Sequence, residues 1–292
     1  MGNQMFQCAF GRFLADTTQG ELVIDKSPLW LDFLFCLLHG SFKFRRHYGL
    51  SAFSGPSKER QLSLLGQCGS LLLWVILRAF PSSMQRLVLN WTGITWSNVL
   101  GGIPTATHMP RNYPTRRANS TLLASGVPLD IPLLPSRDRL REYFAFPPIS
   151  NKELHKLATN IGEGRNWCSV HIRRSDYLSF GGELDTSYHR SAIEYVKSHA
   201  AVDHWLFFSD DIDWCRKTFS DILNALFFEG DYKNPIEDLR FMTLCRSHII
   251  ANSTLSWWGA YLAKEDDVTV YPASWYSAEE SRTRFPTSWK SI

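Results

Sequence analysis

One stretch decides the fold: Cys168-Ser169-Val170-His171-Ile172-Arg173-Arg174-Ser175-Asp176-Tyr177. Its apolar run predicts a short buried strand over Trp167–Ile172, and this strand ends in two arginines and an aspartate. An open α/β sheet holds its ligand at the carboxyl ends of its strands, which is where this charge falls. Two adjacent guanidinium groups are costly to desolvate without an anion, and their planar forks fit phosphate oxygens. For an isolated Arg-Arg pair, a solvated strand end is the commoner alternative.

The second half of the chain is predicted to begin with helices over Arg139–Phe144 and Asn151–Ile161. Strands and helices then alternate to its end. The predicted strands are Cys168–Ile172, Trp205–Ser209, Ala225–Glu229, His248–Ala251 and Val268–Tyr271. The predicted helices between them are Ser187–Ser198, Ile212–Phe219, Pro235–Cys245 and Ser253–Lys264. This alternation is typical of a parallel sheet with crossover helices, so residues 151–292 are predicted to form a Rossmann-like nucleotide-binding domain.

The first half of the chain is harder to interpret. Apolar residues recur at helical spacing and predict a helix that begins at Asn3 or Gln4, and a strand follows over Leu22–Asp25. A helix and a strand with no strand ahead of them look like an α/β unit whose first strand is missing. From residue 81 to 135 glycine, proline, serine and threonine dominate, and periodicity nearly vanishes. We therefore expect residues 1–150 to form an incomplete and irregular domain.

Composition narrows the class of protein. The 292 residues are 44% hydrophobic and 20% charged, as in a soluble globular enzyme. A net charge of +3 suits a small anionic substrate but is far too weak to argue for nucleic acid. The six cysteines form no C-x-x-C pair, which argues against zinc and disulfides and for a reducing, cytoplasmic compartment. We expect no signal peptide, and no transmembrane segment, because the longest apolar run, Leu71–Leu77, is too short.

A second informative stretch is Asn252-Ser253-Thr254-Leu255-Ser256-Trp257-Trp258-Gly259, where a predicted strand runs into a helix. The amino end of such a helix favours an anion by about 0.3–1 kcal/mol when exposed. The alternative is that Ser253 or Thr254 only caps the helix, and the two roles are not exclusive.

Two acidic pairs are less specific. Glu237 and Asp238 in a first helical turn are ordinary acids that complement the helix dipole. Asp211 and Asp213 offer an aspartate-x-aspartate metal site as an alternative. That alternative is disfavoured because Asp213 lies inside the predicted helix and the arginines already neutralise phosphate charge.

Three motifs together resemble the bacterial type of the α-1,2-fucosyltransferases, glycosyltransferase family eleven. They are Gly2-Asn3-Gln4-Met5-Phe6-Gln7, His171-Ile172-Arg173-Arg174-x-Asp176 and Asn252-Ser253-Thr254-x-Ser256-Trp257-Trp258-Gly259. The resemblance covers the first dozen residues and about 138–276. Two shorter segments, Glu237-Asp238-Leu239 and Phe144-x-Phe146, fit the same pattern.

The resemblance implies a GT-B-type fold of two Rossmann-like domains, the first of which is truncated here. Residues 151–292 would bind GDP-β-L-fucose, and residues 1–150 would lie on the acceptor side. The implied reaction transfers fucose, with inversion, to the 2-hydroxyl of a terminal galactose on a glycan acceptor. It needs neither a metal nor another cofactor.

The resemblance also implies a role for individual residues. Arg173 would bind the pyrophosphate, and His171 and Asp238 would face the guanine. Arg174 and Asp176 would brace the loop by an ion pair. The other donor-binding residues would be Asn252, Ser253, Thr254 and Ser256, with Asn3 and Gln4 reaching across from the first domain.

Physical reasoning makes Arg173 the first candidate for a catalytic residue. Breaking the fucosyl bond builds negative charge on GDP, and an arginine fixed there stabilises the transition state more than the ground state. Losing one such donor typically lowers the rate on the order of 10²–10³-fold. The base for the acceptor hydroxyl is not identified, and its candidates by proximity are Asp176, Glu183 and Asp185.

The chain also departs from the family pattern. The opening strand and its glycines are absent ahead of Gly2-Asn3-Gln4, and an expected aromatic segment is missing near Leu122-Leu123-Ala124. One hypothesis is that part of residues 55–135 is frameshifted. The alternative function is therefore a catalytically impaired GDP-sugar-binding protein with a degraded acceptor half.

Overall fold

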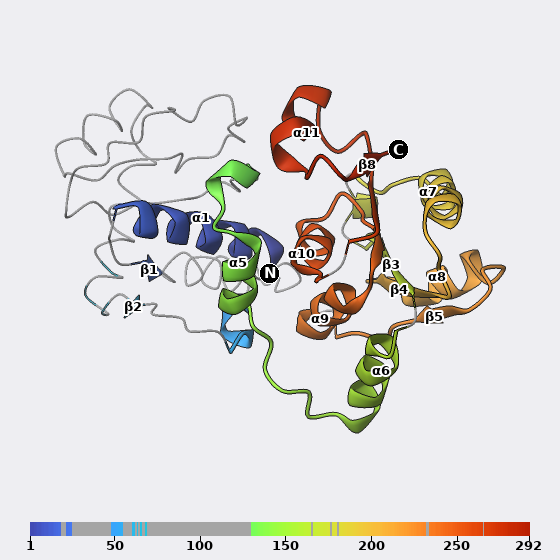
Figure 1. Ribbon diagram of the computed structural model, residues 1–292, viewed down its shortest axis with the longest axis horizontal. Helices are drawn as coiled ribbons and strands as arrows, with labels where there is room; N and C mark the ends of the chain where they lie inside the picture. Colours follow the sequence, from blue (N-terminus) through green and yellow to red (C-terminus); the bar gives the residue numbers. More distant parts are fainter. Residues whose placement is uncertain are drawn as a thin grey trace. The chain divides into compact units, whose positions relative to one another are not determined.

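The computed structural model describes most of the second half of the chain and parts of the first (Figure 1). The described residues are 1–18, 22–24, 48–54, 60–61, 63, 65, 68, 130–164, 166–175, 177–179, 181–231, 234–264 and 266–292. The chain divides into two compact units. The first is Met1, Asn3–Ser51 and Pro56–Ser136, and the second is Gly2, Ala52–Gly55 and Arg137–Ile292. The domains predicted at 1–150 and 151–292 stay a prediction.

The described part of the first unit is small. Helix α1 (Gly2–Thr18) buries Met5, Phe6 and Phe10 completely, as their helical spacing predicted. Strand β1 (Val23–Ile24) pairs in parallel with β2 (Arg60–Gln61). The predicted first helix and the strand near residue 23 are therefore confirmed. Short 3₁₀ turns follow at Gly49–Ala52 and Ile131–Leu133. Most of residues 55–135, on which the frameshift hypothesis falls, lie outside the described residues.

The second unit is built on a parallel six-stranded sheet. Its strands are β3 (Trp167–Ile172), β4 (His204–Ser209), β5 (Ala225–Phe227), β6 (Ser247–Ile249), β7 (Val268–Tyr271) and β8 (Lys290–Ser291). Their order in space is β5-β4-β3-β6-β7-β8, and every neighbouring pair is parallel. The predicted α/β fold with a parallel, Rossmann-like sheet is confirmed.

Two strands end two residues earlier than predicted. After β5, the Phe228 N–H still donates to the Phe207 carbonyl at 2.8 Å, and after β6 the Ile250 N–H donates to the Val270 carbonyl at 3.0 Å. After each of these two bonds, the chain leaves the sheet at the carboxyl end of the strand. The segments that follow β5 and β6 form the loops that precede α9 and α10.

Helices cover both faces of the sheet, which is why all six residues of β3 are buried. The helices are α5 (Arg137–Tyr143), α6 (Lys152–Gly162), α7 (Thr186–His199), α8 (Ile212–Thr218), α9 (Ile236–Leu244), α10 (Thr254–Leu262) and α11 (Ala278–Arg284). Val170 and Phe207 pack with Ile193 of α7, whereas Trp167 and Phe208 pack with Phe241 of α9. Figure 1 shows α7 and α8 on one side of the sheet and α9 and α10 on the other.

The strand order reverses between β3 and β6. The chain builds β4 and β5 on one side of β3, and then returns to build β6, β7 and β8 on the other side. In open parallel sheets, ligands bind in the crevice at the carboxyl ends of the strands where this reversal occurs. The two stretches that the sequence singled out, after β3 and after β6, both lie at this reversal.

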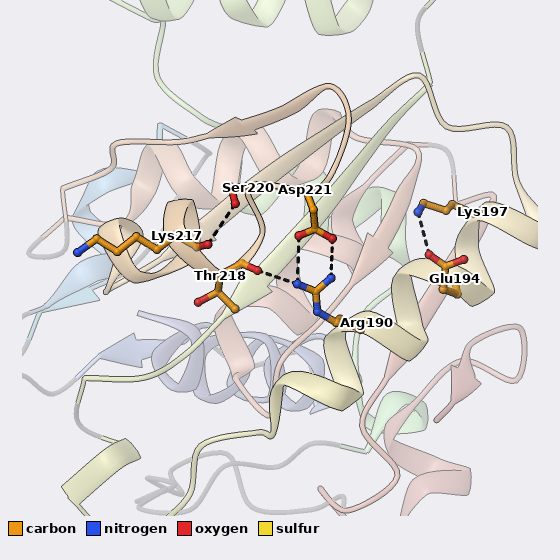
Figure 2. A network of polar contacts seen from close by, with 7 residues as sticks. All are labelled: Arg190, Glu194, Lys197, Lys217, Thr218, Ser220 and Asp221. Atoms are coloured by element: carbon orange, nitrogen blue, oxygen red, sulfur yellow. Dashed lines mark hydrogen bonds and ion pairs between the residues drawn. The ribbon is translucent and has the colours of Figure 1, made fainter.

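Polar contacts fasten the helices to one another. Arg141 of α5 donates to the carbonyls of Leu262, at 3.0 Å, and Ala263 at the end of α10. Arg190 of α7 binds Asp221 through two bonds of 2.8 and 3.1 Å and donates to the Thr218 carbonyl of α8 (Figure 2). The exposed Arg190–Asp221 ion pair is screened by solvent and contributes little to stability. Among the described helices, none is long and apolar enough to cross a membrane.

Candidate functional site

The site begins with Arg173, which follows the last residue of β3. Its Nη1 lies 3.2 Å from Oδ2 of Asp210, the residue that follows β4. The contact is an ion pair without hydrogen-bond geometry, and the Asp210 side chain is only 2% exposed. Because the Arg173 side chain is 22% exposed, a buried carboxylate fixes the guanidinium from one side while part of it stays accessible.

Asp210 also shapes the loop that carries Arg173. Its Oδ1 accepts from the Arg174 backbone N–H at 2.9 Å, and the Ser175 hydroxyl donates to its carbonyl at 3.1 Å. No role was assigned to Asp210 from the sequence. The role arises from the register of the sheet, because Ile172 pairs with Ser209 and the next residues of the two strands, Arg173 and Asp210, therefore lie side by side.

Arg174 is turned toward α8. Its Nε lies 3.3 Å from Asp211 Oδ2, and its guanidinium carbon lies 3.8 Å from the centre of the Trp214 ring. Asp211 Oδ1 accepts from the Trp214 N–H at 3.3 Å, which caps α8. Arg174 therefore pairs with Asp211. The predicted ion pair between Arg174 and Asp176 stays a prediction, because Asp176 lies outside the described residues.

His171 stands on the face of the sheet that α9 covers. It is 5% exposed, and its Nδ1 has no hydrogen-bond partner among the described residues. Burial, followed by the charges of Arg173 and His189, lowers the pKa of His171 to about 3. The imidazole is therefore neutral at physiological pH and can offer a ligand one donor and one acceptor.

The neighbouring acids at the start of α9 differ sharply. Glu237 binds the buried Arg240 through two bonds of 2.7 and 3.1 Å. In the described structure no cation pairs with Asp238, whose Oδ1 is buried without a partner. Burial, with smaller effects from Asp231 and Glu237, raises the pKa of Asp238 to about 7. A carboxylate oxygen that is buried without a partner in a helix first turn needs an explanation beyond the helix dipole.

The loop after β6 is held by side chains from the neighbouring strand connection. The Tyr177 hydroxyl donates to the Asn252 carbonyl at 3.0 Å, and Asn252 Nδ2 donates to the Gly182 carbonyl at 2.9 Å. The Tyr188 hydroxyl donates to the Ile250 carbonyl at 2.7 Å. Asn252 Oδ1 remains buried, and no described residue donates to it.

Ser253 occupies the N-cap position of α10 without acting as a cap. Its backbone is extended, but its side chain accepts no capping hydrogen bond. The Ser256 hydroxyl donates to the Ser253 carbonyl at 3.1 Å. The Ser253 side chain therefore does not supply the acceptor that usually satisfies one backbone N–H group in the first turn of such a helix.

A comparison with models of protein families identifies the family of this chain. The model of glycosyl transferase family 11 matches residues 132–292, more than half of the chain. The chain belongs to glycosyl transferase family 11. That match contains the reversal of the sheet and every site residue described above.

Three curated relatives are each similar to about half of the chain. The O-antigen biosynthesis glycosyltransferase WbnK of Escherichia coli is 34% identical over 145 residues, 47% of this chain and 48% of that protein. An alpha-1,2-colitosyltransferase of E. coli is 35% identical over 158 residues, 50% and 53% of the two chains. Galactoside alpha-(1,2)-fucosyltransferase 1 of Alouatta belzebul is 27% identical over 152 residues, 47% and 41%. The chain spans about half the length of these relatives.

A solved structure, fucosyltransferase NodZ from Bradyrhizobium, resembles the chain with a TM-score of 0.49 and 13% identity. The likeness covers 90% of this chain and 89% of that one. The two-domain GT-B arrangement of this family 11 chain stays a prediction.

Contacts are also described for other predicted residues of this family 11 chain. Asn3 and Gln4 belong to the first unit, where Gln4 Oε1 accepts from the Gly49 N–H at 2.8 Å. Of the candidate bases, Asp185 caps α7 by accepting from the Ser187 N–H at 2.7 Å, and Glu183 is exposed. Within the described ranges, His, Cys, Asp and Glu form no group that could hold a metal ion.

Proposed function

We propose that this family 11 protein transfers L-fucose from GDP-β-L-fucose to the 2-hydroxyl of a terminal galactose, with inversion. The observation that carries the proposal is that a partly exposed, carboxylate-paired arginine follows β3 and the amino end of α10 follows β6, the two neighbouring strands at the reversal of the sheet. Both features favour an anion, and a diphosphate is an anion of suitable size. On composition we further propose a cytoplasmic location and no nucleic-acid partner.

The proposed roles follow from the chemistry of each group. As the fucosyl bond breaks, charge develops on the diphosphate, and Arg173 with the first N–H groups of α10 would stabilise it. Asp210 would hold Arg173 in place, so that little reorganisation is needed during the reaction. Asp238 as a carboxylate would accept hydrogen bonds from the guanine N–H groups, and neutral His171 would bind beside it.

The proposed donor sugar and the proposed linkage are inferred from the names of the relatives. Two of them name an alpha-1,2 linkage, which supports transfer to a 2-hydroxyl. Their names differ in the sugar, colitose in one and fucose in the other. Assays of this chain therefore include a fucosyl and a colitosyl donor, each with β-galactosides as acceptors.

We also propose that transfer needs no metal ion. Arg173 and the α10 amino end would balance the diphosphate charge that Mg²⁺ or Mn²⁺ balances in metal-dependent transferases. Turnover that is unchanged in EDTA is the expected result. Turnover that requires added Mn²⁺ would contradict this part of the proposal.

A second candidate function is GDP-sugar binding without transfer. The family match begins at residue 132, so it supports the donor half of the chain and leaves the acceptor half without support. Tight GDP binding combined with no turnover on any galactoside would favour this candidate.

The experiment measures GDP affinity and GDP release from GDP-fucose with lactose as acceptor. The variants are Arg173→Ala and, as a matched control, Arg190→Ala, which removes an arginine that shares no described partner with Arg173. We expect turnover by the wild type, a loss on the order of 10²–10³-fold in Arg173→Ala, and little change in Arg190→Ala. Absence of GDP binding by the wild type would refute the donor site.

A further inference from the structure

Gly230 lies in the loop between β5 and α9, directly against the carboxylate of Asp238. A Cβ atom at this position would stand 1.9 Å from Asp238 Oδ1, 2.7 Å from Cγ and 2.9 Å from Oδ2. All three distances are too short for atoms that are not bonded. Only glycine fits while the carboxylate stays where it is.

Backbone conformation does not explain this glycine. Among the described glycines, only Gly164 and Gly181 have a positive φ. Gly230 therefore occupies a region of φ that any residue adopts, and its distinctive property is the missing side chain. The requirement for glycine comes from the space that Asp238 fills.

The orientation of Asp238 depends on that space. Glu237, its neighbour, is fixed by two bonds to Arg240, whereas Asp238 has no cation that holds it among the residues described. Its Oδ1 is buried beside Gly230 and accepts no hydrogen bond. The space that Gly230 leaves open is therefore what allows this acceptor to lie where it does.

We infer that Gly230 is a specificity-determining position for the nucleobase of the donor. The missing side chain lets the Asp238 carboxylate stand against the loop and accept from two adjacent N–H groups. This inference rests on the proposed function, in which the donor carries guanine. Guanine presents N1–H and N2–H side by side, hypoxanthine lacks the N2 amine, and adenine has an acceptor at N1. An ionised carboxylate only accepts, so it favours guanine over both.

The test is a double-mutant cycle on the full chain with Gly230→Ala and Asp238→Ala. Affinities for GDP, IDP and ADP are measured by calorimetry for the wild type, both single variants and the double variant. The control is Gly162→Ala, because a Cβ at Gly162 would meet nothing within 4 Å.

We expect Gly230→Ala to weaken GDP binding about 10- to 100-fold and to erase the preference for GDP over IDP. In the Asp238→Ala background the same change should have no further effect, because the carboxylate that it displaces is gone. Gly162→Ala should bind like the wild type. If Gly230→Ala fails to fold and the double variant folds, the clash with the carboxylate is supported directly.

Three results would overturn the inference. The first is a Gly230→Ala variant that binds GDP like the wild type. The second is additive losses in the double variant, which would mean that Gly230 acts on the loop independently of Asp238. The third is an equal loss for GDP, IDP and ADP. A wild type that binds no GDP refutes the proposed function itself, and is thereby distinguished from these three.

Discussion

Asp238→Asn should change stability and ligand binding in opposite directions. The pKa of Asp238 rises from 3.8 to about 7, with burial as the main cause, so above neutral pH the folded chain carries an unfavourable charge. A shift of this size corresponds to about 4 kcal/mol. Because the side chain is partly exposed, we expect a gain of about 1–3 kcal/mol in the free energy of unfolding.

The sign of this effect depends on pH. Folding raises the pKa of Asp238, so the folded state favours the protonated acid. The associated stability is fully present below about pH 4 and is lost as the pH rises through about 7. Asparagine does not titrate. Its advantage over aspartate should therefore be small in acid, grow across this range and level off above it.

The assay is urea unfolding at about pH 5.5 and about pH 8, followed by tryptophan fluorescence, with GDP affinity measured at the higher pH. We expect Asp238→Asn to be more stable than the wild type, mainly at the higher pH, and to bind GDP about 10- to 100-fold more weakly. The matched control is Glu237→Gln. It leaves the buried Arg240 without its ion pair, so it should lower stability at both pH values.

One pattern of results would refute the reasoning. If Asp238→Asn destabilises the chain at the higher pH as Glu237→Gln does, the carboxylate has a structural partner. If GDP binding also survives, Asp238 does not read the nucleobase. Stabilisation together with lost binding is the signature of a group kept for a ligand at the expense of the fold.

Three further predictions concern the same unit. The GDP affinity of the wild type should rise with pH below about pH 7, by up to about tenfold per pH unit, because Asp238 ionises over this range. Calorimetry across pH should show this dependence in the wild type and its absence in Asp238→Asn. Arg174→Met should lower stability by about 1–2 kcal/mol in urea unfolding, through loss of the Trp214 stack, yet weaken GDP binding less than Arg173→Ala. Arg141→Met should cost about 1–3 kcal/mol of unfolding free energy, because two carbonyls at the end of α10 lose their donor, with GDP affinity unchanged.

Local periodicity was sufficient to predict most elements of the second unit. Each strand from β3 to β7 and each helix from α5 to α10 lies within a few residues of its predicted bounds. Helix α11 and strand β8 were missed. The helix does carry a recognisable signal, a capping box in which Ser277 accepts from the Glu280 N–H at 3.3 Å. Strand β8 has only two residues, too few for periodicity to reveal.

The site was predictable where chemistry is local in sequence, and not where it depends on the register between strands. The arginines after β3 and the polar turn after β6 can be recognised in the sequence, because each follows directly after a predicted strand. Asp210 becomes a partner of Arg173 only because β4 lies beside β3. The importance of Gly230 becomes visible only through its contact with Asp238, at the start of α9. Such contacts arise from tertiary structure, which no single-sequence pattern encodes.

Charge pairing within the second unit gives the site a polarity that matches one kind of ligand. Arg173 and Arg174 are each paired with an aspartate, so the loop after β3 can be assembled without an anion. Asp238 has no such counterpart among the described residues and is destabilising when ionised. A ligand with a negatively charged end and a rigid edge of N–H donors would satisfy both under the proposed function, because its anion would meet an accessible arginine and its donors would meet a carboxylate that has no cation. A guanine nucleotide diphosphate has this combination, whereas a simple phosphate or an adenine nucleotide lacks one part of it.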